Sequence, residues 1–515
     1  MVGIVYSAAL SGVEGLVVTV EAKASPSQEP RLEIIGLPDA AVKEAAQRVY
    51  SAAHSSGIAV KHNLLTVNLA PAYIRKEGSA YDLPILIACV YASKENKIDL
   101  SGKCFLGELS LTGALRPVRG VLSMAIAAKE NGFKEIYVPA ENAPEAAAAG
   151  DIKVYAVRNV SELFKHLEGE ASLEECVFDE EAFRVSSMTS ELDMADVKGQ
   201  GFAKYALEIA AAGNHNVLMI GPPGTGKSML ASRLSTILPP LSLDEAIETT
   251  KIHSVSGLLK PSQSLVTARP FRAPHHSVSA AGLAGGGRVP KPGEISLAHN
   301  GVLFLDELPE FDKTAMEILR QPIEEKCVSI TRVNGKTEFP CSFMLVAAMN
   351  PCKCGFYGHP TKQCTCSANS RRQYVSRISG PLLDRIDIQV ELRPLEFELL
   401  STQKTGEGSA EIYARVMRAR EFAKKRFENV TVGGVPVTSN SMMNGSLVRK
   451  YCVLDEKGTA VLKRAYESLG LSARGYDRLL KISRTVADFE ESEIIRCTHV
   501  ATAIQLRTLD RNYWD

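Results

Sequence analysis

The residues Gly221-Pro222-Pro223-Gly224-Thr225-Gly226-Lys227-Ser228 form a complete Walker A loop, and this loop constrains the fold more than any other segment. An apolar run at 217–220 precedes it and a helix-like run begins at Met229, so the segment reads strand, glycine loop, helix. In that setting the loop glycines let backbone N–H groups turn toward phosphate oxygens. Lys227 is then placed to reach the β/γ-phosphates of ATP, and Ser228 to hold Mg²⁺. The loop predicts an α/β domain with a parallel sheet that binds ATP and Mg²⁺.

A second motif supports this prediction. The run Leu303-Phe304-Leu305 ends in Asp306 and Glu307, which is the pattern of a Walker B strand. Asp306 is expected to hold the Mg²⁺, and Glu307 to orient the attacking water. The alternative is an exposed strand end with two solvated acids.

Composition narrows the class of protein. A chain of 515 residues with 45% hydrophobic residues is long enough for two or three domains with their own cores. Lys+Arg and Asp+Glu both total 59, which argues against a protein coated in nucleic acid but allows a local basic surface. The sequence lacks a long apolar run and a cationic, apolar leader, so we expect no membrane span and no signal peptide. Eleven cysteines, an odd number, favour a reducing cytoplasmic location over a disulfide scaffold.

The chain divides into four predicted regions. Residues 1–168 alternate strand-like and helix-like patterns, with Asp39 as a possible N-cap. Residues 169–195, rich in Glu and Ser, are expected to be a linker, and 196–392 carry the nucleotide motifs. From about 393 to 515 the strand patterns stop and amphipathic helices follow, around 410–427, 455–469, 472–488 and 496–510.

Two further runs carry a resemblance to a known family. They are Phe271-Arg272-Ala273-Pro274-His275-His276 and Ala281-Gly282-Leu283-Ala284-Gly285-Gly286-Gly287. They resemble magnesium-chelatase-type AAA+ ATPases, and nearly the whole chain is similar to the ComM/YifB family within that group. The resemblance implies a Lon-protease-like α/β domain, a P-loop AAA+ core and a C-terminal helical lid.

The Lon-like domain is expected to be catalytically inactive. A Lon protease needs a serine nucleophile and a lysine base, and these positions fall on Ala80 and Leu122. Ser79 lies one residue away from the first position, but the nearest lysine after Leu122 is Lys129. A nucleophile without an activating base is weak. A scaffold or docking role is therefore expected.

Residues 255–297 lengthen the core between the two Walker motifs, and the resemblance implies a helix-2 insert that faces the pore of a ring. Ordinary polar packing is the alternative for its His275-His276 pair, and metal ligation is disfavoured because neighbouring side chains point apart.

Residues 328–339 predict a β-hairpin with its turn at Asn334-Gly335. The resemblance implies a pore hairpin whose Arg332 and Lys336 contact DNA; simple solvation of these two side chains is the alternative.

Three more residues are assigned to the nucleotide site by resemblance. Asn350, after the strand-like run 344–349, is the expected sensor 1. Arg385 is the expected arginine finger, reaching the neighbouring subunit's nucleotide, with Arg377 as runner-up and a surface ion pair to Asp384 or Asp387 as the alternative. Arg474 is the expected sensor 2, with Arg478 as a less favoured substitute.

A cysteine loop at 352–366 holds Cys352, Cys354, Cys364 and Cys366. Four thiolates within 15 residues can close a tetrahedral Zn²⁺ site, in which His359 could replace one cysteine. The alternative is a reduced, metal-free loop.

The leading functional hypothesis is a DNA motor. The resemblance implies an ATP-hydrolysing ring, expected to be a hexamer, that acts as a branch-migration helicase on single-stranded or branched DNA in recombination or natural transformation. Recombinases or other recombination proteins are the expected partners. A chelatase-like ATPase that remodels a protein partner is the second hypothesis, and an ATP-dependent protease is the third.

Overall fold

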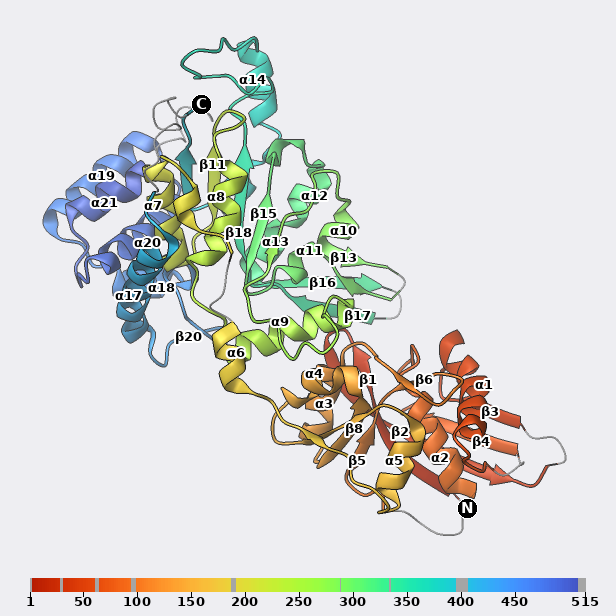
Figure 1. Cartoon of the computed structure of the whole chain (residues 1–515). Coiled ribbons are helices and arrows are strands. Elements are labelled where there is room, and N and C mark those ends of the chain that lie inside the picture. The colour runs from red at the N-terminus through yellow and green to blue at the C-terminus, as the bar shows by residue number, and fades with distance from the viewer. Residues whose placement is uncertain are drawn as a thin grey trace. The chain divides into compact units, whose positions relative to one another are not determined.

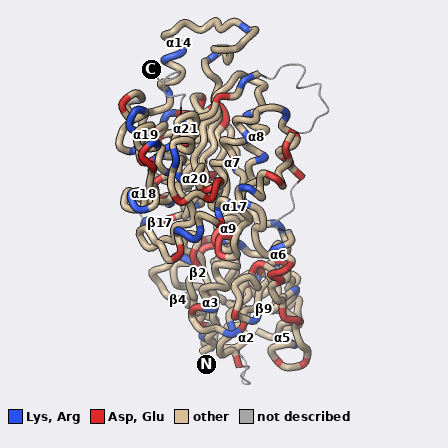
Figure 2. Tube along the Cα trace, turned by 90° about the vertical axis from the view of Figure 1, so that its left-hand side faces the viewer, with Lys and Arg blue, Asp and Glu red and all other residues tan. Residues whose placement is uncertain are grey.

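The computed structural model describes residues 2–27, 31–60, 64–93, 99–186, 191–287, 289–332, 335–394 and 406–507 (Figure 1). By contacts the chain forms two compact units. Unit 1 comprises residues 1–187, 242–267 and 331–339, and unit 2 comprises 188–241, 268–330 and 340–515. Basic and acidic residues are both spread over the trace (Figure 2), in keeping with the zero net charge.

Unit 1 is built on an eight-stranded mixed sheet with the order β10-β9-β8-β5-β1-β2-β4-β3. Its strands are β1 (Val2–Ser11), β2 (Glu14–Ser25), β3 (Arg31–Ile35), β4 (Leu64–Ala70), β5 (Lys103–Phe105), β8 (Glu135–Pro139), β9 (Lys153–Val157) and β10 (Glu175–Cys176), and a small hairpin adds β6 (Glu108–Leu109) and β7 (Leu115–Arg116). Its helices are α1 (Ala40–Ser55), α2 (Asp82–Ser93), α3 (Val121–Glu130), α4 (Ala143–Ala147), α5 (Val160–Leu167), α6 (Glu180–Ser186) and α9 (Leu243–Ser256). Asp39 caps α1 as predicted, because its carboxylate accepts the Val42 N–H at 2.8 Å.

Helices cover both faces of this sheet. Gly3 of β1 lies against α2 and Gly15 of β2 lies against α3, and the β1–β2 register places these two glycines on opposite faces. At either position a Cβ atom would collide with a helix backbone carbonyl, that of Ala88 or of Ser123, so only glycine allows so close an approach.

Helix α9 belongs to unit 1 although it lies far along the chain. Ser254 Oγ accepts the Gly120 N–H at 2.8 Å and donates to the buried carboxylate of Glu145. Glu145 also accepts the Leu122 N–H at 3.0 Å. Burial raises the pKa of Glu145, and these hydrogen bonds act in the opposite direction. The first part of the predicted 255–297 insert, residues 255–267, belongs to unit 1: residues 255 and 256 end helix α9, and 257–267 follow it.

Unit 2 contains a five-stranded, all-parallel sheet with the order β12-β15-β18-β11-β19. The strands are β11 (Val217–Ile220), β12 (Phe271–Arg272), β15 (Val302–Leu305), β18 (Met344–Met349) and β19 (Ile388–Glu391). Short ladders add β13 (Gly285–Gly286) with β14 (Lys291–Pro292) and β20 (Thr431–Val432) with β21 (Val435–Pro436), and the hairpin β16 (Cys327–Arg332) with β17 (Gly335–Pro340) contributes residues to both units. The helices of the core are α7 (Gly201–Gly213), α8 (Lys227–Arg233), α10 (Ala280–Ala284), α11 (Glu294–Leu297), α12 (Lys313–Ile318), α13 (Arg320–Glu325), α14 (Ala368–Val375) and α15 (Gly380–Leu383).

The C-terminal region is helical. Its helices are α17 (Ser409–Phe427), α18 (Gly445–Tyr451), α19 (Glu456–Leu469), α20 (Ala473–Phe489) and α21 (Cys497–Gln505). Helices α17 and α20 pack against α7 of the core, and the apolar sides of all three enter one continuous hydrophobic cluster. Three of the four helices expected from periodicity are confirmed to within one residue at each end, and the fourth, expected at 496–510, spans 497–505 in the described residues. Helix α18 and the β20–β21 ladder were not expected.

One sequence expectation differs in detail from the structure, and a second lies partly outside the described residues. The predicted linker at 169–195 contains β10, which pairs antiparallel with β9 and extends the sheet of unit 1, and it also contains α6. The turn predicted at Asn334-Gly335 includes Asn334, which lies outside the described residues, although the two strands flanking it pair as expected.

Candidate active site

The Walker A loop lies at the carboxyl edge of the parallel sheet in unit 2. It connects β11 to α8, with Gly226 as the N-cap of α8. Gly224 and Gly226 have φ angles of 80° and 92°, a left-handed region that favours glycine, so the loop conformation depends on these two residues. The strand–loop–helix context predicted from the sequence is confirmed.

Lys227 is buried inside this loop. Its Nζ donates to the carbonyls of Gly221 and Pro222 at 2.7 and 3.0 Å and to Asn350 Oδ1 at 3.2 Å. Burial lowers the pKa of Lys227, and the negative charges of Asp306 and Glu307 act in the opposite direction. The loop lysine and the predicted sensor 1 asparagine therefore meet directly, because β18 lies beside β11 in the sheet.

The two predicted Mg²⁺ ligands also meet. Ser228 Oγ donates to Asp306 Oδ2 at 2.6 Å. Parallel neighbours bring their carboxyl ends to the same edge, so the β15 carboxylate lies within reach of the hydroxyl at the start of α8. A serine hydroxyl beside a carboxylate is an all-oxygen donor set that suits Mg²⁺.

Glu307 follows Asp306 in an unusual backbone conformation. Its φ of 52° lies in the left-handed region, which is uncommon for a residue with a side chain and is often found at functional sites. Its N–H donates to Asp306 Oδ1 at 2.9 Å. About half of the Glu307 side chain is exposed, and its Oε2 lies 3.5 Å from Nδ1 of His276. This contact was not predicted from the sequence.

The two candidate arginine fingers occupy different settings. Arg385 is buried: its Nη2 lies 2.7 Å from Glu324 Oε1, and its Nη1 donates to the Pro381 carbonyl at 2.6 Å. Arg377 is about half exposed and lies 3.1 Å from Glu310. The ion pair of Arg385 is therefore made with Glu324, and not with Asp384 or Asp387 as the alternative interpretation held.

The lid presents Arg474 and Arg478 from the start of α20. Ser472 caps this helix through the Gly475 N–H, and Arg474 is exposed. Arg478 instead lies beside Asp387, the residue before β19, with its Nε 3.4 Å from Asp387 Oδ1. Of the two arginines, Arg474 is the more exposed, and its role as sensor 2 stays a prediction.

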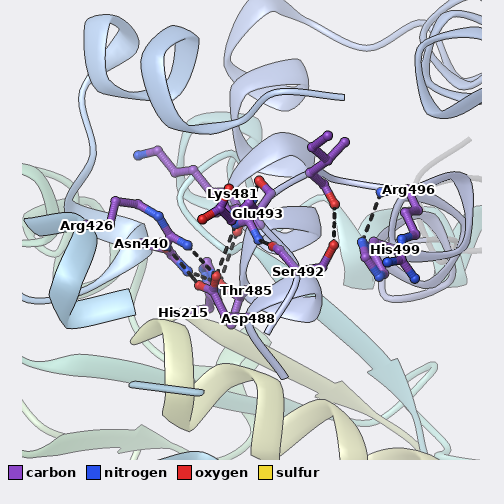
Figure 3. Close-up of polar contacts among 12 residues, drawn as sticks. His215, Arg426, Asn440, Lys481, Thr485, Asp488, Ser492, Glu493, Arg496 and His499 are labelled. Carbon is purple, nitrogen blue, oxygen red and sulfur yellow. Dashed lines mark hydrogen bonds and ion pairs between the residues drawn. The ribbon is translucent and has the colours of Figure 1, made fainter. Parts of the chain in front are cut away.

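A buried polar network joins the lid to the core (Figure 3). His215, between α7 and β11, lies 3.4 Å from Asp387 through Nδ1 and 2.8 Å from Thr485 Oγ1 of α20 through Nε2. Asn440 bonds both Thr485 and Asp488. Burial alone would raise the pKa of Asp387, but the contact with His215 and the positive charges nearby lower it to about 2. Sequence reasoning missed this network, because its members come from positions that lie far apart in the chain.

Asp488 is the centre of the network on the lid side. Its buried carboxylate accepts from Arg426 Nη2 at 2.5 Å and Nη1 at 3.0 Å, from Arg484 Nε at 3.1 Å and from Asn440 Nδ2 at 2.7 Å. Arg484 is itself buried and donates to the Glu493 carbonyl at 2.6 Å. The network thus ties α17, α20 and the loop after α20 together.

The four predicted cysteines converge. Their Sγ atoms all lie within 4.8 Å of one another, with Sγ–Sγ distances of 3.4 Å for Cys352–Cys354, 3.7 Å for Cys352–Cys364 and 3.6 Å for Cys354–Cys364. Backbone N–H groups, among them that of Phe356, point at the Cys352 and Cys354 sulfurs. His359, the alternative ligand, instead accepts the Thr361 and Lys362 N–H groups through Nδ1. This arrangement fits a four-sulfur metal site.

The predicted DNA contacts are exposed. Arg332 lies at the end of β16, and Lys336 lies on β17 with its Nζ 2.5 Å from Glu338. In the insert, Arg272 makes a two-pronged ion pair with Glu294 at 2.7 and 2.8 Å, and Arg269 donates to backbone carbonyls. Arg288, also counted in the insert, lies outside the described residues.

The Lon-type positions carry no serine–lysine pair. Leu122 is buried, and Ser79 Oγ bonds Glu108, a carboxylate that also lies 3.7 Å from Arg116. Lys129 Nζ bonds the Ala149 carbonyl at 2.5 Å. Catalytic inactivity of this domain stays a prediction.

A parallel sheet with Walker A, Walker B and an asparagine at one edge defines the core of an AAA+ ATPase of the magnesium-chelatase type. Three family models match the chain: magnesium chelatase subunit ChlI at residues 193–400, subunit ChlI of Mg-chelatase at 20–142, and the ChlI C-terminal region at 406–507. YifB of Salmonella typhimurium is 42% identical over 510 residues, covering 99% of this chain and 97% of that protein. Competence protein ComM of Haemophilus influenzae is 41% identical over 514 residues, covering 99% and 98%. The chain belongs to the ComM/YifB family of magnesium-chelatase-like AAA+ proteins.

A more distant similarity concerns Lon. Lon protease of Porphyromonas gingivalis is 29% identical over 189 residues, which is 34% of this chain and 22% of that protein. The predicted fold class is confirmed: a Lon-like α/β region, a P-loop AAA+ core and a helical C-terminal region. Among the described residues, no helix is long and apolar enough to cross a membrane.

Proposed function

We propose that this protein is an ATP-driven ring motor that moves branched DNA, acting as a branch-migration helicase in recombination or natural transformation. The observation that carries the DNA assignment is the similarity over 99% of the chain to a protein named for competence, the ability of bacteria to take up DNA. The paired contacts Lys227–Asn350 and Ser228–Asp306 support ATP and Mg²⁺ as the energy source. In this proposal Lys227 binds the phosphates, Ser228 and Asp306 hold Mg²⁺, and Glu307 orients water.

The motor is proposed to be a closed ring, a hexamer, because a finger from one subunit completes its neighbour's site only in a head-to-tail arrangement. Arg385 is the proposed finger and Arg474 the proposed sensor 2. The ion pair with Glu324 holds Arg385 within its own subunit, so assembly has to break this pair before the guanidinium can reach a neighbouring nucleotide. Arg377, which is half exposed, is the second candidate.

DNA is proposed to contact the β16–β17 hairpin through Arg332 and Lys336. Both side chains are exposed, and a ring repeats them around one axis, which concentrates positive charge in a chain that is neutral overall. DNA phosphates would then replace Glu338 as the partner of Lys336.

The decisive experiment measures ATP hydrolysis with and without a synthetic four-way junction. Stimulation by the junction and ATP-dependent movement of its branch point are expected. Arg332→Ala/Lys336→Ala should keep basal hydrolysis but lose stimulation, whereas Lys463→Ala/Arg464→Ala, a matched exposed pair on α19, should behave like the parent. If the hairpin variant moves junctions at the parental rate, the hairpin is not the DNA contact.

A second function is favoured by the chelatase family models, which match all three regions of the chain. In that case the same ATPase remodels a protein partner during metal insertion. Hydrolysis that ignores every DNA tested and rises with a protein partner would favour this alternative.

A structural Zn²⁺ in the cysteine loop is the second metal that we propose. A tetrahedron with Zn–S bonds of about 2.3 Å has S–S edges of roughly 3.8 Å, close to the three separations given above. The loop begins two residues after Asn350, and a Cβ on Gly355 would come within 2.7 Å of Pro223 in the Walker A loop. The metal would therefore hold the segment that follows sensor 1 against the phosphate-binding loop.

Metal analysis of protein purified without chelator tests this site. About one Zn²⁺ per chain is expected, falling to near zero in Cys364→Ser/Cys366→Ser and unchanged in the control Cys176→Ser, which lies on β10. Zinc-free protein that is folded and fully active would show that the thiols hold no functional metal.

A further inference from the structure

The chain places a histidine beside the Walker B glutamate through strand register. Strand β12 pairs parallel with β15, with Arg272 opposite Leu303. His276 comes four residues after Arg272, and Glu307 comes four residues after Leu303. Both residues therefore fall just beyond the same edge of the sheet. Their side chains meet there, with His276 Nδ1 3.5 Å from Glu307 Oε2.

The histidine is held in place by its surroundings. Its ring lies edge-on to Phe311, at a centroid distance of 6.5 Å, and against the ring of His275 at 4.0 Å. The two histidine rings thus lie together, contrary to the expectation that neighbours point apart. His275 in turn bonds Ser277 at 2.8 Å, and the Arg272–Glu294 ion pair anchors the strand from which the segment leaves.

A cavity of about 330 Å³ lies at this contact, lined by Ala273, Pro274, His275, His276, Phe304, Asp306 and Glu307. Residues 273–276, from the run that resembles the chelatase signature, thus line the same cavity as the two Walker B carboxylates. About half of the Glu307 side chain is exposed, so burial alone does not fix the orientation of its carboxylate. His276 is the neighbouring group that can.

We propose that His276 is a positioning residue for Glu307 and holds its carboxylate in the orientation that aligns the attacking water. This inference rests on the proposed ATPase function. The 3.5 Å separation is longer than an ordinary hydrogen bond, as is common for catalytic contacts before substrate binds. Loss of a group that orients a catalytic carboxylate beside a metal site lowers activity by roughly tenfold to a hundredfold. Because Lys227 and the loop N–H groups bind the phosphates, the loss should appear in kcat and not in the affinity for ATP.

The test compares three substitutions in the full-length protein. His276→Leu removes the ring nitrogen, His276→Gln keeps an N–H donor, and His54→Leu makes the same change at an exposed histidine of α1. ATP Kd, KM and kcat are measured for each. We expect a kcat loss of at least about tenfold in His276→Leu with unchanged ATP Kd, partial recovery in His276→Gln and parental values in His54→Leu.

Three results would overturn the inference: parental kcat in His276→Leu, no recovery in His276→Gln, or a loss of ATP binding equal to the loss of kcat. Glu307→Gln separates this failure from failure of the proposed function. If Glu307→Gln is inactive while His276→Leu is parental, the positioning role alone is wrong. If Glu307→Gln also hydrolyses ATP normally, the Walker B assignment is wrong as well.

Discussion

Asp488 is the residue whose loss should loosen the lid most. Its carboxylate accepts hydrogen bonds from Arg426, Arg484 and Asn440, and both Asp488 and Arg484 are almost fully buried. Asp488→Ala leaves two guanidinium groups in the interior without their carboxylate. Removal of one partner of a buried ion pair costs about 3–5 kcal/mol. That free energy corresponds to a factor of roughly 10² to nearly 10⁴ in the opening equilibrium of the lid helices.

Hydrogen exchange measures this opening directly. Peptides from α17 and α20 in Asp488→Ala should exchange faster by roughly 10²-fold or more, because their amides exchange through local opening of the lid. Peptides from the β11–β18 sheet should change much less. Asp488→Asn, which keeps one acceptor oxygen, should fall between parent and alanine variant.

Glu467→Ala is the matched control, since Glu467 is an exposed carboxylate on α19 of the same lid. Surface substitutions of this kind change stability by about 0.5 kcal/mol or less. If lid peptides of Asp488→Ala and Glu467→Ala exchange at the same rate, the buried network does not hold the lid, and the apolar contacts of α17 and α20 with α7 do so alone.

Three further outcomes are expected. Lys227→Ala should lose ATP binding, whereas Glu307→Gln should bind ATP without turnover; nucleotide binding and single-turnover assays separate the two. Arg385→Ala should assemble and bind ATP yet hydrolyse it poorly. Mixing this variant with Lys227→Ala should restore part of the activity. If mixing restores none and the protein stays monomeric at saturating ATP, a finger acting between subunits is ruled out. The pKa of Asp387 in the folded protein is about 2, below its usual value of 3.8. Its ionisation therefore contributes about 2 kcal/mol to the free energy of unfolding, which is present above pH 4 and lost as the pH falls toward 2. Acid unfolding of Asp387→Asn should lack this loss of stability between pH 4 and 2.

Much of the nucleotide site could be predicted because its parts are local. The glycines of the Walker A loop, the two acids after β15 and the asparagine after β18 each follow an apolar run that marks its strand. Parallel pairing then brings the three strand ends together without further information. The four cysteines lie within 15 residues of one another, so loop closure alone limits where their sulfurs can go.

The remaining contacts join residues that are distant in sequence. His215 meets Asp387 and Thr485 from positions 172 and 270 residues away, and no periodicity marks such a pair. The approach of His276 to Glu307 depends on the register of a two-residue strand that the sequence does not reveal. Helix α9 comes directly before most of the predicted 255–297 insert and packs within unit 1, because the position of its partner Glu145 is set by the fold of the N-terminal region.

The division of the chain into two units has a practical consequence for protease experiments. Unit 1 is assembled from three separate stretches and unit 2 from three others, so the backbone passes between the units five times. A single cleavage between residues 187 and 191 separates residues 1–187 covalently from the rest of the chain, but noncovalent contacts with α9 and with the β16–β17 hairpin still hold this piece. A fragment ending at 187 would also leave the buried Glu145 carboxylate without Ser254. Nicked protein should thus elute as one species on a sizing column and separate into two bands in denaturant.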